Sequence, residues 1–428
     1  MAEADPASPP LEKAGFLARA TAPGEALAPF GYPAFRAIWL AYMFSQIGSM
    51  IQTVAAAWLM TGLTTSHAMV AGVQASANLP ILCFAVLAGA LADNFDRRMV
   101  MLVSQCAMLV VAGTLSLLTW LEWIGPWSLL AFTLAVGSGA ALNGPAWHAS
   151  VRAQVGQRDL PAAISLNTIA NNLGRSLGPA LGGLLVALTS VAVAFAVNSL
   201  SFCALIWALL RWRPNLPKPV RRPILPSVAE GLSFCIHSSP LRRILLRCFC
   251  VGAGGTAFHA LLPSVVRTSA HGNEFDYGLV LAAFGVGSVG GALMVTSARR
   301  RFGAEALVTA GSLAMGVGIV AIGLQTRTWA MMPFAVLVGA GWIAAMTTFN
   351  VGMQVRSPEP ILGRCMAVYQ AVVFGGISLG AWGWGLASDA AGLPFAMIAA
   401  GCWLLLNAAC ARLVAPMPVR GEGRVDPA

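Results

Sequence analysis

One arginine interrupts an apolar stretch of this sequence, and it is the side chain best placed to do chemistry. The stretch LNTIANNLGRSLGPALGGLL, residues 166–185, places Arg175 well inside a predicted membrane span. An arginine at the centre of a bilayer costs about 2.5–3.5 kcal/mol, so we expect its side chain to face a cavity or a polar partner. Two interpretations stay open. Arg175 is either a cation in a transport pathway, which attracts anions or moves with a gate, or a structural arginine that binds free carbonyl groups at a helix break.

Small and polar residues accompany Arg175 on one side of this predicted helix. At about 100° per residue, most of them fall within an arc of about 100°. Small residues let another helix approach closely and a proline permits a bend, so we expect this side to pack between two halves of the protein. A plain packing stripe would explain the glycines but not the arginine. The residues of this fifth-span motif are Asn171, Gly174, Arg175, Gly178, Pro179, Gly182 and Gly183.

A second group of charged residues lies in the stretch GALADNFDRRMV, residues 89–100, which contains Asp93, Arg97 and Arg98. The same spacing of Gly-Ala-Leu and Arg-Arg returns in GALMVTSARRRF, residues 291–302, where apolar residues replace the acids. The repeat predicts two halves that begin on the same side of the membrane. The acids are therefore kept in one half only. A basic loop that only fixes membrane orientation would need no acid at this position, and that interpretation stays open as the alternative to a further role for the acids.

Composition sets the class of the whole chain. Of its 428 residues, 57% are hydrophobic and 10% are charged, with a mean hydropathy of +0.74, whereas a soluble domain carries about 25% charged residues. Long apolar runs recur throughout, each long enough for a membrane helix of about 20 residues. We therefore predict an all-α integral membrane protein with twelve transmembrane helices in two six-helix bundles. Residues 227–236 are predicted to form an amphipathic helix on the membrane surface.

Basic residues set the predicted orientation. The formal charge is +10, and nearly all of the 26 basic residues fall on the side of the chain termini and the central linker. The excess of Lys and Arg makes that side cytoplasmic, so both termini are expected there. The predicted organisation is a disordered cytoplasmic N-terminus at 1–33, a bundle at 34–212, a cytoplasmic linker at 213–240, a second bundle at 241–415 and a cytoplasmic tail at 416–428.

The loop motif and the fifth-span motif together resemble the major facilitator superfamily. The loop pattern of that family is Gly-x-Leu-Ala-Asp-basic-x-Gly-basic-basic, and here Asn94 and Asp96 replace its first basic residue and its second glycine. The resemblance implies two bundles that close alternately on a central cavity. It also implies a cytoplasmic gate in which Gly89, Asp93, Arg97 and Arg98 meet the start of the eleventh span at Gly363 and Arg364.

In this family the first, fourth, seventh and tenth spans line the cavity, which implies that polar residues on these spans contact the substrate. Taken singly, each such residue is explained as well by an interhelical hydrogen bond worth about 0.6 kcal/mol. The candidate substrate-binding residues are Gln46, Asn143, Arg175, His259, Asn350 and, on the eleventh span, Gln370.

A narrower resemblance is carried by stretches such as PILGRCMAVYQAVVFGGISLGAWGWG, residues 360–385. They are similar to a subgroup of bacterial exporters that includes the enterobactin exporter and macrolide-efflux-type carriers. This implies a monomeric efflux transporter, an antiporter, in the bacterial inner membrane that exports a siderophore-like or amphipathic drug-like small molecule. The alternatives are an importer or lipid carrier of the same fold, and a non-transporting scaffold or sensor.

Other kinds of chemistry find no support in the sequence. We find no Ser-His-Asp constellation, no metal-ligand spacing and no GxxxxGK[ST] loop, so we expect no enzyme activity, no metal and no cofactor. The basic charge is explained by membrane orientation and lipid contact rather than by nucleic acid. Protons stay a candidate coupling ion, although no Asp or Glu lies at the centre of a predicted span. His259 is the titratable alternative.

Overall fold

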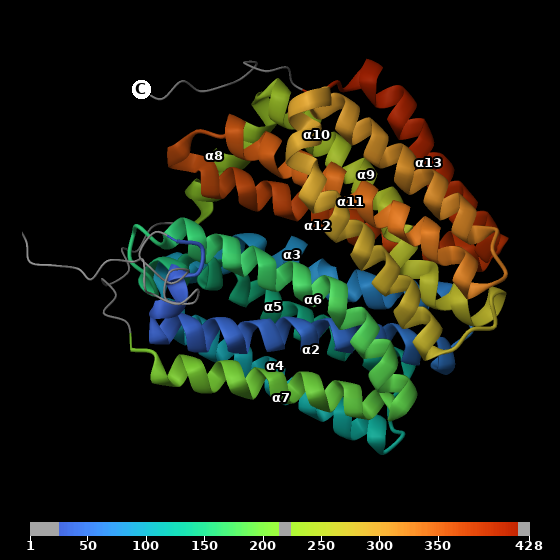
Figure 1. Cartoon of the computed structure of the whole chain (residues 1–428), viewed down its shortest axis with the longest axis horizontal. Helices are drawn as coiled ribbons and strands as arrows, with labels where there is room; N and C mark the ends of the chain where they lie inside the picture. Colours follow the sequence, from blue (N-terminus) through green and yellow to red (C-terminus); the bar gives the residue numbers. More distant parts are fainter. Residues whose placement is uncertain (1–24, 214–223, 418–428) are drawn as a thin grey trace, which may run out of the picture.

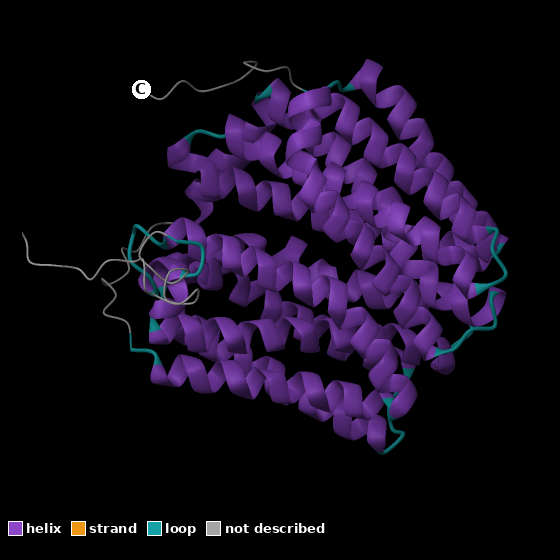
Figure 2. Ribbon diagram, in the orientation of Figure 1, coloured by secondary structure: helices purple, strands orange, loops and turns teal. Residues whose placement is uncertain are grey.

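The computed structural model describes residues 25–213 and 224–417 of the chain, with the backbone alone described at some positions, residues 89–94 among them. Every regular element in these residues is a helix, as Figure 2 shows. The all-α prediction is confirmed.

The first group of helices begins and ends according to local sequence rules. Pro33 opens α2, where a missing backbone N–H costs nothing. Asp96 caps α4 by accepting a hydrogen bond of 2.9 Å from the N–H of Arg98. Ser190 caps α7 in the same way. This first group comprises α2 (Pro33–Leu63), α3 (His67–Asn94), α4 (Arg97–Trp120), α5 (Pro126–Ser150), α6 (Leu160–Leu188) and α7 (Val191–Arg211).

A connecting helix, α8 (Ile224–His237), precedes the second group and includes the predicted surface helix. Within the second group, α10 is broken at Gly303, whose φ of 83° is a conformation that glycine adopts readily. The break divides α10 into two helical arms. The second group comprises α9 (Ser239–Ser264), α10 (Glu274–Gly323), α11 (Thr328–Arg356), α12 (Leu362–Ala391) and α13 (Leu393–Val414).

Within the described residues, nine helices are long and apolar enough to cross a membrane. Neither α2 nor α6 belongs to this set; Gln46 and Gln52 interrupt the apolar sequence of α2, and Asn171 and Arg175 interrupt that of α6. The two arms of α10 enter the set as one helix, although Gly303 separates them. A multi-pass membrane protein is therefore established, and the count of twelve spans stays a prediction.

The two groups lie against each other in Figure 1, and contact is made chiefly by α3 with α12 and by α6 with α10. Their helices run between two ends of the molecule. We call these the terminal end, formed by residues 94–98, 150–160 and 356–364 with α8 beside them, and the distal end, formed by residues 63–67, 188–191 and 389–393.

Residues 28–33, predicted as part of a disordered N-terminus, form a short 3-10 helix and the start of α2 instead. Phe30 packs edge-on against the rings of Phe35 and Trp39, with centroid separations of 5.9 and 5.0 Å. The hydroxyl of Tyr32 donates a hydrogen bond of 3.0 Å to Asp159, at the start of α6. These aromatic contacts hold the segment against the first group. Residues 1–24 lie outside the described part of the chain.

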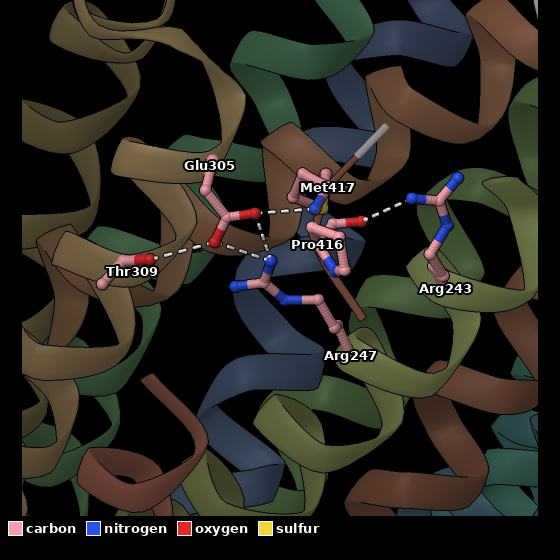
Figure 3. A network of polar contacts seen from close by, with 6 residues as sticks. All are labelled: Arg243, Arg247, Glu305, Thr309, Pro416 and Met417. Carbon is pink, nitrogen blue, oxygen red and sulfur yellow. Dashed lines mark hydrogen bonds and ion pairs between the residues drawn. The ribbon is translucent and has the colours of Figure 1, made fainter. Parts of the chain in front are cut away.

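An ion pair between a buried arginine and a partly exposed glutamate holds the end of α13 at the terminal end of the second group. Arg247 of α9 is 1% exposed, and its Nη1 donates to both carboxylate oxygens of Glu305 at 2.9 and 2.7 Å. The same carboxylate accepts from the N–H of Met417 at 2.6 Å and from the hydroxyl of Thr309 at 3.3 Å, as Figure 3 shows. The segment after α13 is thereby attached to α9 and to the second arm of α10.

Candidate functional site

A cavity of about 600 Å³ lies between the two groups of helices. Its wall is formed mainly by α2, α3, α5 and α6 of the first group and by α9 to α12 of the second group. Apolar and aromatic side chains alternate with amide groups, which is the usual character of a small-molecule site. The amide side chains in the wall are Gln52, Gln74, Asn78, Asn198, Asn350 and Gln370.

Arg175 projects into this cavity from the middle of α6, and its side chain is exposed there. Among the residues that the structure describes, none forms a hydrogen bond or ion pair with its guanidinium, and no Asp or Glu lines the cavity. An ionisable residue inside a membrane protein normally faces such a cavity because burial in lipid is costly. The geometry favours the interpretation of Arg175 as a cation in the pathway, since a structural arginine would need a carbonyl partner.

One turn before Arg175, Asn171 ties α6 to α2. Its Oδ1 accepts hydrogen bonds from the hydroxyl of Tyr42 at 2.9 Å and from Nε2 of Gln46 at 2.6 Å. Its Nδ2 donates to the carbonyl of Asn167 at 3.0 Å. A carbonyl oxygen has two lone pairs, and both are used here. This network fixes the rotation of α6 relative to α2, and therefore the direction from which Arg175 enters the cavity.

Aromatic rings surround His259 on the part of the wall that the second group forms. The imidazole ring meets Phe284 edge-on at 4.7 Å between centroids and Trp342 edge-on at 6.4 Å. Phe258 also meets the histidine edge-on, with a centroid separation of 5.0 Å, and stacks on Phe284 at 5.1 Å. Phe284 and Trp342 both line the cavity together with His259. The second group thus presents an aromatic surface, whereas the first group presents the arginine.

The structure brings four of the six predicted substrate residues to the cavity: Arg175, His259, Asn350 and Gln370. Gln46 and Asn143 do not line it. Gln46 is bonded to Asn171, as described above, and the Oδ1 of Asn143 is buried without a partner among the described residues.

Sequence reasoning passed over the pair Gln52 and Asn198, which are hydrogen-bonded to each other and line the cavity. Both interrupt apolar spans, as Gln46 does, so composition offered the same signal for all three. Only the rotation of each helix about its axis separates the cavity residues from the interhelical ones.

The fifth-span glycines were expected to pack between the two halves, and three of them do not. An added Cβ on Gly174 or Gly182 would lie 3.0 or 3.1 Å from the nearest atom of α2, and Gly178 is in still closer contact with that helix. Residues four apart share one face of a helix, which explains why these three meet the same neighbour. Gly183 lies on a different face and meets Gly278 of the second group. Pro179 lines the cavity.

The arginines of the predicted gate bond within the first group. Arg97 donates to the carbonyl of Ala149 at 3.3 Å. Arg98 donates to the carbonyls of Leu209 and Leu210 at 2.8 and 2.9 Å. Both arginines therefore satisfy the open C-terminal ends of neighbouring helices.

Arg364, on the other side of the predicted gate, is not bonded to these arginines either. Arg364 forms an ion pair with Glu230 of α8, and a Cβ added to Gly363 would meet nothing within 4 Å. For Gly89 and Asp93 the structure describes the backbone alone. None of the described gate residues bonds to another across the two groups in this conformation.

The distal end, in contrast, is closed by polar contacts that cross between the groups. Asp389, near the end of α12, accepts hydrogen bonds from the hydroxyl of Ser66 at 2.6 Å and from the backbone N–H groups of His67 and Ala68 at 2.6 and 3.2 Å. The carboxylate thus caps the N-terminus of α3, where free N–H groups and the helix dipole favour a negative charge.

Two further contacts reinforce this closure. Arg267, just after α9, donates to the hydroxyl of Thr61 at 2.9 Å and lies 5.5 Å from the ring centroid of Trp58. Gly183 and Gly278 are so close that a Cβ added to Gly183 would lie 2.7 Å from the Cα of Gly278. The backbones of α6 and α10 therefore touch without any side chain between them.

Comparison with known proteins identifies the family. The family model described as "Transmembrane secretion effector" matches residues 24–426. The chain belongs to the transmembrane secretion effector family. This family is part of the major facilitator superfamily of transporters, so the resemblance seen in the loop and fifth-span motifs is confirmed.

Two exporters are similar to most of the chain. A multidrug efflux pump, Tap, of Mycolicibacterium fortuitum is 24% identical over 86% of this chain and 92% of its own length. The enterobactin exporter EntS of Citrobacter koseri is 26% identical over 82% of this chain and 84% of its own length. Among solved structures, a bacterial homologue of the human lysosomal transporter Spinster, in an inward-facing and unoccupied conformation, matches with a TM-score of 0.73 at 15% identity. That match covers 94% of this chain and 99% of the other, and it establishes the fold alone.

Proposed function

We propose that this protein is a secondary active exporter that carries a siderophore-like or amphipathic drug-like small molecule across the bacterial cytoplasmic membrane by alternating access. The observation that carries the proposal is the cavity between the two groups, closed at the distal end by contacts that join one group to the other. A cavity between two sets of helices opens to either side when one set rocks against the other. The similarity to a multidrug efflux pump and to an enterobactin exporter supports both the direction of transport and the class of cargo.

The terminal end is proposed to face the cytoplasm, with both chain termini on that side. Lys and Arg are enriched in cytoplasmic loops, and the described arginines gather at the terminal end. In this orientation the closed distal end faces the outside, so the conformation would receive its cargo from the cytoplasm. The arginines that support this assignment are Arg97, Arg98, Arg152, Arg158, Arg211, Arg242, Arg243, Arg299, Arg300, Arg301, Arg356 and Arg364.

We further propose that the predicted terminal gate forms when the distal end opens. Asp93 ends α3 at the terminal end, beside the region where α12 begins, and Asp389 lies near the end of α12 at the distal end, where α3 begins. The same helix pair thus carries one carboxylate at each end, each suited to cap the N-terminus of its partner. The proposed gate consists of Gly89, Asp93, Arg97, Arg98, Gly363 and Arg364.

We propose two bundles, at residues 34–212 and 241–415, as the moving units, and the monomer as the working unit, since one chain supplies the whole wall of the cavity. Protons are the proposed coupling ion. His259 is the candidate proton carrier because an imidazole titrates near neutral pH in water and its ring lines the same cavity as Arg175.

The test is transport into inverted membrane vesicles that contain the full chain. Labelled enterobactin and labelled antibiotics are offered outside, with and without an imposed pH gradient, and vesicles lacking the protein serve as control. Accumulation above the control means export, and its dependence on the gradient reports proton coupling. Faster loss of preloaded compound means an importer. If no compound moves and none raises the unfolding temperature of the purified protein, the chain is a scaffold or sensor and the proposal fails.

A further inference from the structure

We infer that the cargo of the cavity is an amphipathic molecule with a negative charge, which Arg175 binds directly. The inference rests on the proposed transport function and names the chemical class that the site accepts. It excludes organic cations as preferred cargo.

The described part of the cavity wall carries one positive charge and no negative charge. Arg175 is the only Asp, Glu, Lys or Arg side chain among the described residues that line it. The carboxylates closest along the chain to lining residues, Glu274 and Asp276, are at the distal end and outside the wall. A cation held in a poorly polarisable interior exerts a strong field on its surroundings. The wall therefore attracts an anion and repels a second cation.

The guanidinium of Arg175 also has N–H groups that donate to no described residue. Arginine offers five N–H donors, which match the two oxygens of a carboxylate, sulfonate or phosphate. No described residue accepts a hydrogen bond from Arg175, and the carbonyl oxygen of its neighbour Asn171 is already occupied by two donors of α2. The donors are free because the protein has not supplied an acceptor at this position. A cargo anion would complete the site, and its charge would be balanced at the same time.

The rest of the cavity wall is suited to contact an apolar and partly aromatic part of a cargo molecule. His259, Phe284 and Trp342 form one continuous aromatic surface on the second group. Phe374 and Met346 extend the apolar part of the wall. Aromatic rings stack or meet edge-on with other rings at such distances. The arginine and the aromatic surface come from opposite groups, so a molecule with one anionic and one aromatic part would contact both.

The test compares three probes that share a pyrene ring and a four-carbon chain: 1-pyrenebutyrate, 1-pyrenebutanol and 1-pyrenebutylammonium. Binding to the purified full-length protein is followed by energy transfer from tryptophan to pyrene, since Trp342 lies in the wall. We expect the butyrate to bind roughly 10- to 100-fold more tightly than the other two, because a hydrogen bond to a charged group is worth about that factor. Equal or tighter binding of the ammonium compound would overturn the inference, and this result needs no variant.

Variants then assign the preference to Arg175. In Arg175→Gln we expect the advantage of the butyrate to fall to about threefold or less, whereas Arg175→Lys keeps a cation and most of the preference. Arg327→Gln is the matched control, since it removes an exposed arginine outside the cavity. An unchanged preference in Arg175→Gln would show that another group binds the anion. If the protein binds the anion but moves nothing in vesicles, the transport proposal fails alone. If it moves cations and not anions, this inference fails alone.

Discussion

The carboxylate of Asp389 accepts a hydrogen bond of 2.6 Å from the backbone N–H of His67, which is 322 residues earlier in the chain. One helix of each group takes part in this contact, and the acceptor lies where the dipole of α3 favours a negative charge. The closure of the distal end thus depends on a charge at a helix terminus. Removing the charge of Asp389 should therefore make the distal end open more often.

We expect Asp389→Asn to weaken the closed distal end by about 1–2 kcal/mol, because the neutral amide loses both the dipole interaction and the charge-assisted hydrogen bonds. Amide hydrogen exchange over residues 64–70 should then be roughly 5- to 30-fold faster. Glu122→Gln is the control, since Glu122 is an exposed acid at the same end. Unchanged exchange in Asp389→Asn would mean that the capping contact does not hold this end closed.

The glycine contact gives a second prediction, in which size rather than charge changes. A Cβ at position 183 would lie 2.7 Å from the Cα of Gly278 and 2.8 Å from the carbonyl oxygen of Glu274, both backbone atoms that cannot move aside. Gly183→Ala should therefore force the distal end apart, raise hydrogen exchange there and reduce transport. Gly290→Ala is the matched control because a Cβ at that position of α10 meets nothing within 4 Å. Normal transport by Gly183→Ala would contradict the role of this contact.

The ion pair between Arg247 and Glu305 predicts which of two variants, a single or a double one, unfolds at the lower temperature. Glu305→Leu leaves the charge of Arg247 buried without its partner, which should cost about 3–5 kcal/mol. The double change Arg247→Met with Glu305→Leu removes both charges and should be less destabilised than the single change. Thermal unfolding of the purified protein, followed by tryptophan fluorescence, measures both. A double variant less stable than the single one would mean that the pair itself stabilises the second group.

The hydrogen bonds of Asn171 predict that a variant can lose ligand binding while Arg175 keeps its charge. Such a variant tests the position of Arg175 separately from its charge. Asn171→Leu leaves the Tyr42 hydroxyl and the Gln46 amide without their acceptor, at about 1–3 kcal/mol for each group that stays buried. Because α6 is then free to rotate, we expect pyrenebutyrate binding to weaken even though Arg175 is intact. Thr168→Val, an exposed change on the same helix, should leave both stability and binding unaltered. Equal binding in Asn171→Leu and the parent protein would show that α6 keeps its rotation without this network.

Much of the architecture could be predicted from the sequence, because lipid accepts only long apolar helices. The exposure of Arg175 to a cavity followed from the same physics, since a guanidinium cannot be left in hydrocarbon. The break of α10 at Gly303 directly follows the second Arg-Arg motif, where the sequence repeat predicts a loop between two spans. Residues 28–33 were misjudged, since their aromatic residues find partners only once α2 and α6 are assembled.

The details of the site depended on quantities that one sequence does not contain. Gln46 and Gln52 are equally polar and lie on the same helix, yet only Gln52 lines the cavity. Their difference is a rotation about the axis of α2, which is set by packing against α6. The capping of α3 by Asp389 could not be predicted either, because no sequence pattern connects Asp389 with His67.

The contact between Gly183 and Gly278 also limits how gradually the distal end can open. Two bare backbones attract each other through dispersion, and a gap of about 0.5–1 Å already forfeits a quarter to a half of that attraction. Partly opened arrangements therefore lose a large share of this contact energy, and neither glycine has a side chain that could bridge the gap. The pair should make the transition abrupt, so that molecules observed one at a time would dwell in closed and open states and pass rapidly between them.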